Sequence, residues 1–425
     1  MTSTANTSQY QTGKSYIQSI TIIGILFFIF GFVTWINGTL IPYLKIACEL
    51  ESDFQSFLVA TAFFIAYTVM AIPSSMVLRK TGYKKGMAIG LLIMAVGAFI
   101  FIPAASTRNF NLFLVGLFII GTGLALLQTA SNPYASKIGP IESAASRISI
   151  LGISNKIAGI LAGLIFGYIT LNDADALEAS LKTMDAATKA ATLDELASRV
   201  IVPYIIITAV LIVLAIAIMF SSLPDINDSG EEEGSPSTDK SSAFAFPHLM
   251  LGVLALFLYV GVEVMAGDTI ISYGKSLGIE LSTARFFTQW TLVGMLVGYI
   301  IGIATIPRYL SQSTALKICA SLGVLFTLLA LITTGYTSVA CIALLGLANS
   351  LMWPAIFPLA IDGLGKYTKI GSALLIMAIS GGAILPLVYA KVSEVLNSQQ
   401  AYGIMIPCYL FIFYYATSGY KAGRK

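Results

Sequence analysis

The stretch GFVTWINGTLIPYLK at residues 31–45 decides the fold, because a related stretch returns later in the chain. Set over GVEVMAGDTIISYGK at residues 261–275, it gives the identities Gly31/Gly261, Thr39/Thr269, Ile41/Ile271, Tyr43/Tyr273 and Lys45/Lys275. A second match sets LLQTASNP (126–133) over LANSLMWP (347–354), with Gln128 opposite Asn349 and Pro133 opposite Pro354. An internal repeat indicates that two structural units of one kind follow each other.

Composition places the chain in a membrane. Of its 425 residues, 57% are hydrophobic and only 11% are charged, whereas about a quarter of the residues of a soluble domain are charged. Apolar runs of roughly 20 residues, the length of a helix that crosses the hydrocarbon core, recur from end to end. Barrel strands would instead alternate over about 10 residues. We therefore expect an all-α membrane protein with twelve transmembrane helices, near residues 18–43, 54–78, 86–105, 110–136, 146–171, 200–222, 248–274, 284–306, 315–334, 337–361, 370–392 and 400–418.

Two polar stretches interrupt the apolar runs. Residues 172–199 are polar and rich in alanine, which predicts a helical loop, whereas residues 224–247 have the Pro, Gly, Ser and acidic composition of a linker. The linker separates a tail (1–17) and a six-helix bundle (18–223) from a second six-helix bundle with a short tail (248–425). Two parallel six-helix repeats are the layout of the major facilitator fold, which opens alternately to each side of the membrane.

The lysines and arginines predict the orientation. If the N-terminus is cytoplasmic, 15 of the 24 fall on the cytoplasmic side and 8 on the outer side, while Lys156 lies within a helix. The positive-inside rule thus favours two cytoplasmic termini, which requires an even number of spans. We expect a multi-pass protein of a bacterial inner membrane.

Few residues of catalytic type are present, which argues against an enzyme. The cysteines Cys48, Cys319, Cys341 and Cys408 are scattered without metal-ligand spacing, and the only histidine, His248, stands at a helix entrance. We therefore expect no catalytic residue, no metal and no cofactor. The net charge of +3 gives no reason to expect a nucleic-acid partner.

Three ionisable residues lie deep in apolar segments. Among the 21 acidic residues only Glu263 and Asp268 are deep, and Lys156 is the basic residue that matches them. A charge in hydrocarbon costs at least about 2.5–3.5 kcal/mol, so each must face a cavity or a partner. We favour a cavity role for Asp268 and Glu263, with a structural ion pair as the alternative. For Lys156 we slightly favour a structural counter-charge over direct contact with a substrate.

Amides and tryptophans cluster within four helices. Gln128 and Asn132 share one helix face because they are four residues apart, and Asn349 and Trp353 do the same. Amides both donate and accept hydrogen bonds, and an indole face can pack on the apolar face of a sugar ring. Ordinary interhelical hydrogen bonding is the alternative. The candidate substrate-binding residues are Gln128, Asn132, Asn349, Trp353, Trp35, Asn37, Gln289 and Trp290.

A resemblance to a known family adds to this interpretation. The chain resembles the fucose–proton symporter family of the major facilitator superfamily, which includes bacterial fucose, glucose/galactose and N-acetylglucosamine permeases. The likeness spans nearly the whole chain outside the tail, the 172–199 loop and the linker, and LQTASNP (127–133) is its most specific element. It is carried by FFIFGFVTWINGTLIPYLK (27–45), LVGLFIIGTGLALLQTASNPY (114–134), YVGVEVMAG (259–267), NSLMWPAIFPLAI (349–361) and GSALLIMAISGGAILPL (371–387).

Two positions depart from the fucose branch of that family. The branch has an aspartate in helix 1 where this chain has Gly38, and a glutamate in helix 4 where it has Gln128. Gln128 matches the glucose/galactose branch, whereas Asn37 and Gly38 with Lys156 look more like the N-acetylglucosamine branch. Because the repeat sets Asp268 opposite Gly38, we expect the titrating carboxylate to have moved to the second half.

The resemblance implies a secondary active sugar transporter. We expect proton-coupled uptake of a neutral hexose or N-acetylhexosamine (glucose, galactose, mannose or N-acetylglucosamine) by a monomer. Asp268 is the expected proton carrier, and Glu263 its relay or the partner of Lys156. In the alternative of sodium symport, Asp268 would be a permanently ionised ligand of the ion. The alternative of another class is a membrane nutrient sensor on a transporter fold, which would be expected to carry a sizeable signalling domain.

Overall fold

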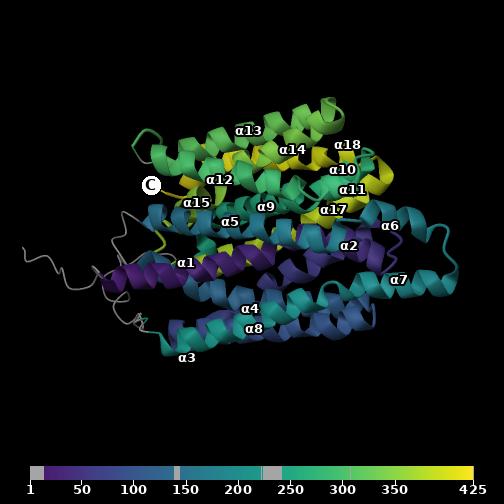
Figure 1. Ribbon diagram of the computed structural model, residues 1–425. Helices are drawn as coiled ribbons and strands as arrows, with labels where there is room; N and C mark the ends of the chain where they lie inside the picture. The colour runs from purple at the N-terminus through teal and green to yellow at the C-terminus, as the bar shows by residue number, and fades with distance from the viewer. Residues whose placement is uncertain (1–13, 138–143, 222, 224–241, 307, 425) are drawn as a thin grey trace, which may run out of the picture.

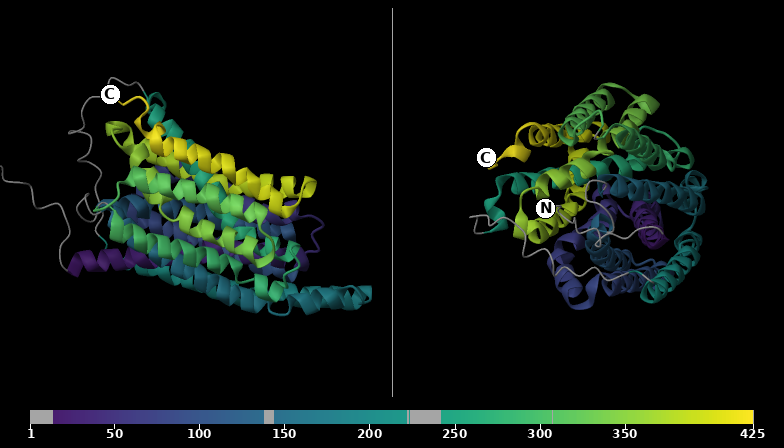
Figure 2. Two further views of the ribbon diagram at one scale, coloured as in Figure 1. Left: turned by 90° about the horizontal axis from the view of Figure 1, so that it is seen from above. Right: turned by 90° about the vertical axis from the view of Figure 1, so that its left-hand side faces the viewer.

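The computed structural model describes residues 14–137, 144–221, 223, 242–306 and 308–424, and helices are the regular elements found among them. The long helices run side by side, and the described ends of the chain lie at the same end of the bundle (Figures 1 and 2). We call this end the terminal end, and the opposite end, where α6 and α7 project, the α6–α7 end. Termini at one end fit an even number of spans.

The elements of the first half, residues 14–221, are α1 (Lys14–Trp35), α2 (Asn37–Ala47), α3 (Asp53–Ser106), α4 (Phe110–Lys137), α5 (Ala144–Leu171), α6 (Ala174–Leu181), α7 (Ala186–Ser198) and α8 (Ile201–Phe220). The elements of the second half, residues 242–424, are η3 (Ala243–Ala245), α9 (Pro247–Asp268), α10 (Ile270–Ser276), α11 (Leu281–Ala284), α12 (Phe287–Thr305), α13 (Gln312–Ile332), α14 (Gly335–Asn349), α15 (Met352–Ile361), η4 (Gly365–Tyr367), α16 (Thr368–Met377), η5 (Ala378–Ser380), α17 (Gly381–Val395), α18 (Ser398–Ala401), η6 (Tyr402–Ile404), α19 (Met405–Thr417) and η7 (Gly419–Lys421).

These elements make the expected twelve spans. Ten stretches of the described chain are long and apolar enough to cross a membrane as they stand. One of them is α3, whose 54 residues would extend about 81 Å as one helix. Gly82 breaks it with φ 75° and ψ 172°, a conformation open mainly to glycine, so that α3 forms two spans. The last span is α19, which is short but continues α18 and η6.

The polar 172–199 segment is helical as predicted, because α6 and α7 lie within it. Most of the predicted linker, residues 224–241, lies outside the described residues, as does most of the N-terminal tail. The division into two six-helix bundles therefore stays a prediction. In Figure 1, α3, α4 and α8 lie along one side of the molecule and α12, α13 and α14 along the other.

Several spans that look continuous in sequence are broken in the structure. α1 ends at Trp35 before α2, α9 ends at Asp268 before α10, and Ser350 and Leu351 separate α14 from α15. Freed backbone carbonyls in a membrane need another donor. The hydroxyls of Thr288 and Thr291 on α12 donate to the carbonyls of Gly267 (2.7 Å) and Ala266 (3.2 Å), so the end of α9 is satisfied by a neighbouring helix.

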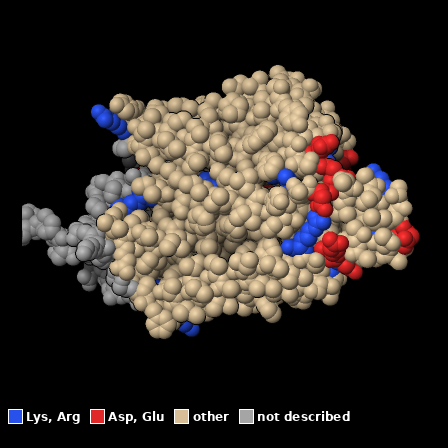
Figure 3. Space-filling model, viewed as in Figure 1, with Lys and Arg blue, Asp and Glu red and all other residues tan. Residues whose placement is uncertain are grey.

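Close helix contacts and an apolar outer surface complete the membrane-embedded body. A Cβ on Gly31 would lie 1.9 Å from the carbonyl oxygen of Asn155, and one on Gly346 would lie 1.9 Å from that of Thr291. Glycine at these sites brings α1 against α5 and α14 against α12. The sides of the bundle are apolar, and the charged side chains gather at its two ends (Figure 3).

Candidate functional site

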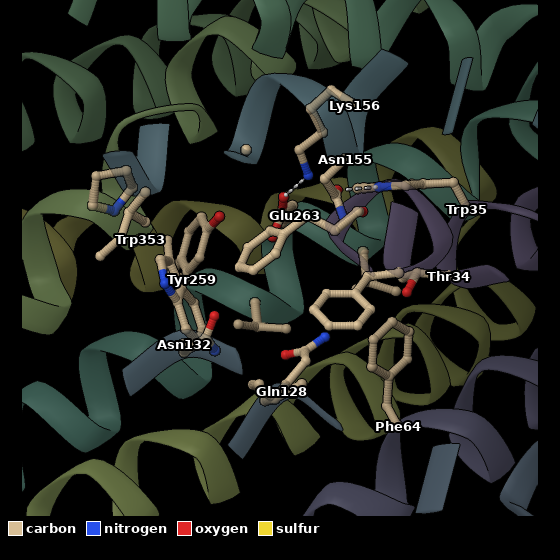
Figure 4. Close-up of a pocket in the computed structure, with 18 of the residues that line it drawn as sticks. Thr34, Trp35, Phe64, Gln128, Asn132, Asn155, Lys156, Tyr259, Glu263 and Trp353 are labelled. Carbon is tan, nitrogen blue, oxygen red and sulfur yellow. Dashed lines mark hydrogen bonds and ion pairs between the residues drawn. The ribbon is translucent and has the colours of Figure 1, made fainter. Parts of the chain in front are cut away.

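A cavity of about 150 Å³ lies between the two halves. At about 30 Å³ for a water molecule in the liquid, it has room for about five waters, the scale of one small molecule. Its walls come from α1, α3, α4 and α5 of the first half and from α9, α12, α15 and η5 of the second. Polar and aromatic side chains face one another across it (Figure 4).

An ion pair joins the two halves at this cavity. The Nζ of Lys156 on α5 lies 3.0 Å from Oε1 of Glu263 on α9, and the two side chains are only 7% and 12% exposed. The same Nζ lies 4.4 Å from the centre of the Trp35 ring, a cation–π contact. The ion pair expected for Lys156 is thus present with Glu263, and it offsets part of the cost of burying either charge.

Asn155 positions the ring that covers Lys156. Trp35 Nε1 donates to Asn155 Oδ1 at 3.4 Å, and Asn155 Nδ2 donates to the carbonyl of Phe27 at 3.3 Å. The Asn155 side chain therefore links α5 to α1 at Phe27 and at Trp35, and Figure 4 shows the contact with Trp35. The sequence marks Lys156 by its charge, but a neutral amide next to it carries no comparable signal.

Asp268 lies at the cavity, at the end of α9. It is 1% exposed, and no hydrogen bond or ion pair to it is found among the described residues. Its Oδ1 faces Gly38 so closely that a Cβ at residue 38 would lie 3.3 Å from it and 3.0 Å from Thr288 Oγ1. The two positions that the repeat sets in correspondence therefore meet each other in space, and a side chain at residue 38 would press against the carboxylate of Asp268.

Amides and aromatic rings form the remaining polar walls. Gln128 Nε2 donates to the hydroxyl of Tyr67 at 3.0 Å, and Asn132, one turn further along α4, also lines the cavity. Trp353 on α15 lines it too, and its ring stacks on Phe357. Seven of the predicted residues are thus brought together here, namely Gln128, Asn132, Trp353, Trp35, Asp268, Glu263 and Lys156.

Four predicted substrate residues lie away from the cavity lining. Asn349 is buried, and its Oδ1 accepts from the hydroxyl of Tyr409 at 2.9 Å. Asn37, at the start of α2, is fully buried, and no partner for its amide is found in the described chain. Gln289 packs against Gly163, while Trp290 is 43% exposed on the outside of the bundle. Consecutive residues of a helix point about 100° apart, so Gln289 and Trp290 cannot share one wall.

The cavity is lined by three tyrosines that residue type alone does not single out in the sequence. Tyr67, Tyr259 and Tyr299 line it, as does Thr34. The chain has 20 tyrosines, so residue type alone does not single out these three. Tyr259 stands four residues before Glu263 and could have been placed on its helix face by that spacing.

Contacts between the halves close the cavity towards the α6–α7 end. There α2 packs against α9 and α10, and the Thr61 hydroxyl of α3 donates to the carbonyl of Ala383 of α17 at 2.8 Å. Towards the terminal end, α16 of the second half packs against α3 and, less extensively, against α4 of the first half. A buried site between two halves is the arrangement of a secondary transporter that works by alternating access.

Comparisons with known proteins agree with this class. The family model of the major facilitator superfamily matches residues 23–387, and the chain belongs to this superfamily. It is 34% identical over 412 residues to the glucose/galactose transporter of Brucella abortus (strain 9-941), which covers 96% of both chains. It is 33% identical over 412 residues to the L-fucose-proton symporter of Escherichia coli (strain K12), which covers 95% of this chain and 93% of the relative.

Solved structures agree on the fold. The crystal structure of a major facilitator transporter, FucP, in the outward conformation matches with a TM-score of 0.74 and 29% identity, over 95% of this chain and 99% of that one. An inward-facing bacterial homologue of the lysosomal transporter Spinster matches with a TM-score of 0.66 and 14% identity, over 97% and 99%, which shows the fold alone. The resemblance and the fold expected from the sequence are confirmed.

Proposed function

We propose that this chain is a proton-coupled transporter that takes up a neutral hexose or N-acetylhexosamine by alternating access. The observation that carries the proposal is Asp268, a buried carboxylate that faces a cavity lined by amides and indoles and for which the described residues offer no cationic partner. The relatives support it, because their names describe glucose/galactose transport and fucose–proton symport.

The amides and indoles suit a sugar. Gln128, Asn132 and Asn155 each offer a donor and an acceptor to hydroxyl groups. Trp35 and Trp353 offer flat apolar faces to the ring carbons. Glucose, galactose, mannose and N-acetylglucosamine are the candidates.

The deep charges divide into two roles. Glu263 is held by Lys156 at 3.0 Å, which makes it a structural partner first and a relay second. Asp268 has no such partner among the described residues, and we infer that it exchanges a proton with the cavity. Fucose–proton symport in a relative favours the proton over sodium, for which Asp268 would serve as an oxygen ligand.

The charge distribution gives the orientation. Arg79, Lys80, Lys84 and Lys85 flank the break of α3 at Gly82, and Lys317 lies near the start of α13. These charges lie at the terminal end, which the positive-inside rule places in the cytoplasm. The protein then lies in a bacterial inner membrane with both termini inside. We infer that a monomer suffices, since the cavity is built by one chain.

Transport in purified proteoliposomes tests this function. Counterflow of labelled sugar separates a transporter from a nutrient sensor or an enzyme. In liposomes without sodium, an inward proton gradient should drive accumulation, and Asp268→Asn should abolish accumulation while sparing exchange. Accumulation that requires sodium and ignores the proton gradient rules out the proton, and normal accumulation by Asp268→Asn rules out the carboxylate under either ion.

A further inference from the structure

The segment between α5 and α8 reaches across to the second half. Asp175, in the first turn of α6, accepts hydrogen bonds from the backbone N–H groups of Leu281 and Ser282, each at 2.8 Å. These residues begin α11, whose own N-cap residue, Glu280, makes no side-chain cap. Asp175 thus caps a helix of the opposite half.

The corresponding helix start in the first half, that of α3, is capped by residues of its own half. α3 begins with a capping box, in which Ser52 Oγ accepts from the N–H of Gln55 and Gln55 Oε1 accepts from the N–H of Ser52. Both halves therefore have a helix start after the broken helix pair, but only the first half supplies its own cap.

The repeated lysines show the same difference. Lys45 pairs with Asp53 of its own half, whereas its counterpart Lys275 pairs with Glu178 of α6 in the other half. Nearby, Arg285 Nη1 donates to Asn172 Oδ1 at 2.8 Å and to the carbonyl of Gly167 at 3.2 Å. Acidic and basic side chains visibly gather at this end of the molecule (Figure 3).

We propose that α6 is a latch that holds the α6–α7 end closed. The halves must separate there for the cavity to open on that side, so α11 then loses its cap and Lys275 loses its carboxylate. Contacts that exist in only one of two states shift the equilibrium towards that state. The latch therefore favours the state in which the α6–α7 end is closed, whatever the substrate.

Distances between spin labels on the full chain in liposomes test the latch without any sugar. Labels at Ser106→Cys and Gln400→Cys, with the native cysteines replaced by serine, report the gap between α3 and α18 at this end. Asp175→Ala should move the closed-to-open ratio about fivefold towards open, the size of one lost helix cap. Asp185→Ala is the matched control, because Asp185 caps α7 through Ala187 and Thr188 within the first half.

Reversing the charges of the Lys275–Glu178 pair tests the latch independently, because the helix cap by Asp175 stays in place. Glu178→Lys and Lys275→Glu should each lengthen the distance, and the double variant should return it towards that of the parent protein. Unchanged distances in Asp175→Ala and Glu178→Lys overturn the latch. An equal shift in Asp185→Ala also overturns it, because that result would assign the effect to general destabilisation of the segment.

Discussion

Gly38 and Asp268 are two residues that share one site. A side chain at residue 38 would contact Oδ1 of Asp268, so Gly38→Asp alone crowds two carboxylates together and should nearly abolish uptake. Combined with Asp268→Gly, it returns a single carboxylate to the same space from the other half. We expect the double variant to regain part of the accumulation driven by a proton gradient in proteoliposomes.

The control is Asp268→Gly alone, which has no carboxylate at this site and should exchange sugar without concentrating it. A double variant that behaves like this control would show that the carboxylate must stand on α9.

Gln128 is the amide whose loss should weaken sugar binding most directly. Gln128→Ala leaves a sugar hydroxyl unpaired, at a cost of about 1–3 kcal/mol, and should raise the Kd roughly 5- to 150-fold by calorimetry. Trp290→Phe, on the outside of the bundle, should bind normally. Equal affinity of Gln128→Ala and the parent protein would remove Gln128 from the site.

Asn349 shows how tertiary structure changes an expectation. The repeat sets it opposite Gln128, and the sequence alone predicts the same loss of binding for Asn349→Ala. In the structure its amide instead accepts from Tyr409 of α19. We now expect Asn349→Ala to lower the Tm, because the Tyr409 hydroxyl would be left buried without this acceptor.

Among the elements, α5 and α9 depend on each other through one ion pair. Lys156→Ala leaves Glu263 buried without its partner, which typically costs 3–5 kcal/mol. Lys156→Ala with Glu263→Ala should recover part of the lost Tm, measured in detergent. The control is the exposed pair of Lys189 and Glu49, whose removal should cost less than about 1 kcal/mol. Additive effects of the Lys156 and Glu263 substitutions would refute the coupling.

The interrupted helices show what the pattern of apolar residues does not predict about a single transmembrane element. Apolar runs near 18–43 and 248–274 each predict one continuous helix, and the structure divides each of them in two. The length of an apolar run shows how many residues of a segment lie in the membrane. It does not report where the backbone hydrogen bonds of the helix are interrupted, because at the end of α9 the replacing hydroxyls come from another helix, α12.

At the scale of the whole molecule, a deletion in the linker tests whether this segment does more than connect the two halves. Its acidic run at residues 231–233 lies outside the described residues. A flexible tether tolerates small changes of length, so deleting this run should leave the rate of sugar uptake nearly intact. A Gly-Ser replacement of equal length is the control. Lost uptake with normal expression, in the deletion alone, would show that the linker acts as a gate.

The sequence by itself determined the class of fold and the deep charges. Composition and span length require a membrane bundle, because both can be counted along short stretches of the chain. The repeat in residues 31–45 and 261–275 indicates its internal symmetry, because the two segments can be compared by residue type alone. Only the tertiary structure decided that Lys156 pairs with Glu263, that Asp268 lies against Gly38, and that Trp290 faces outwards. These contacts join residues more than 100 positions apart or depend on a helix's rotation, which packing against neighbouring helices sets.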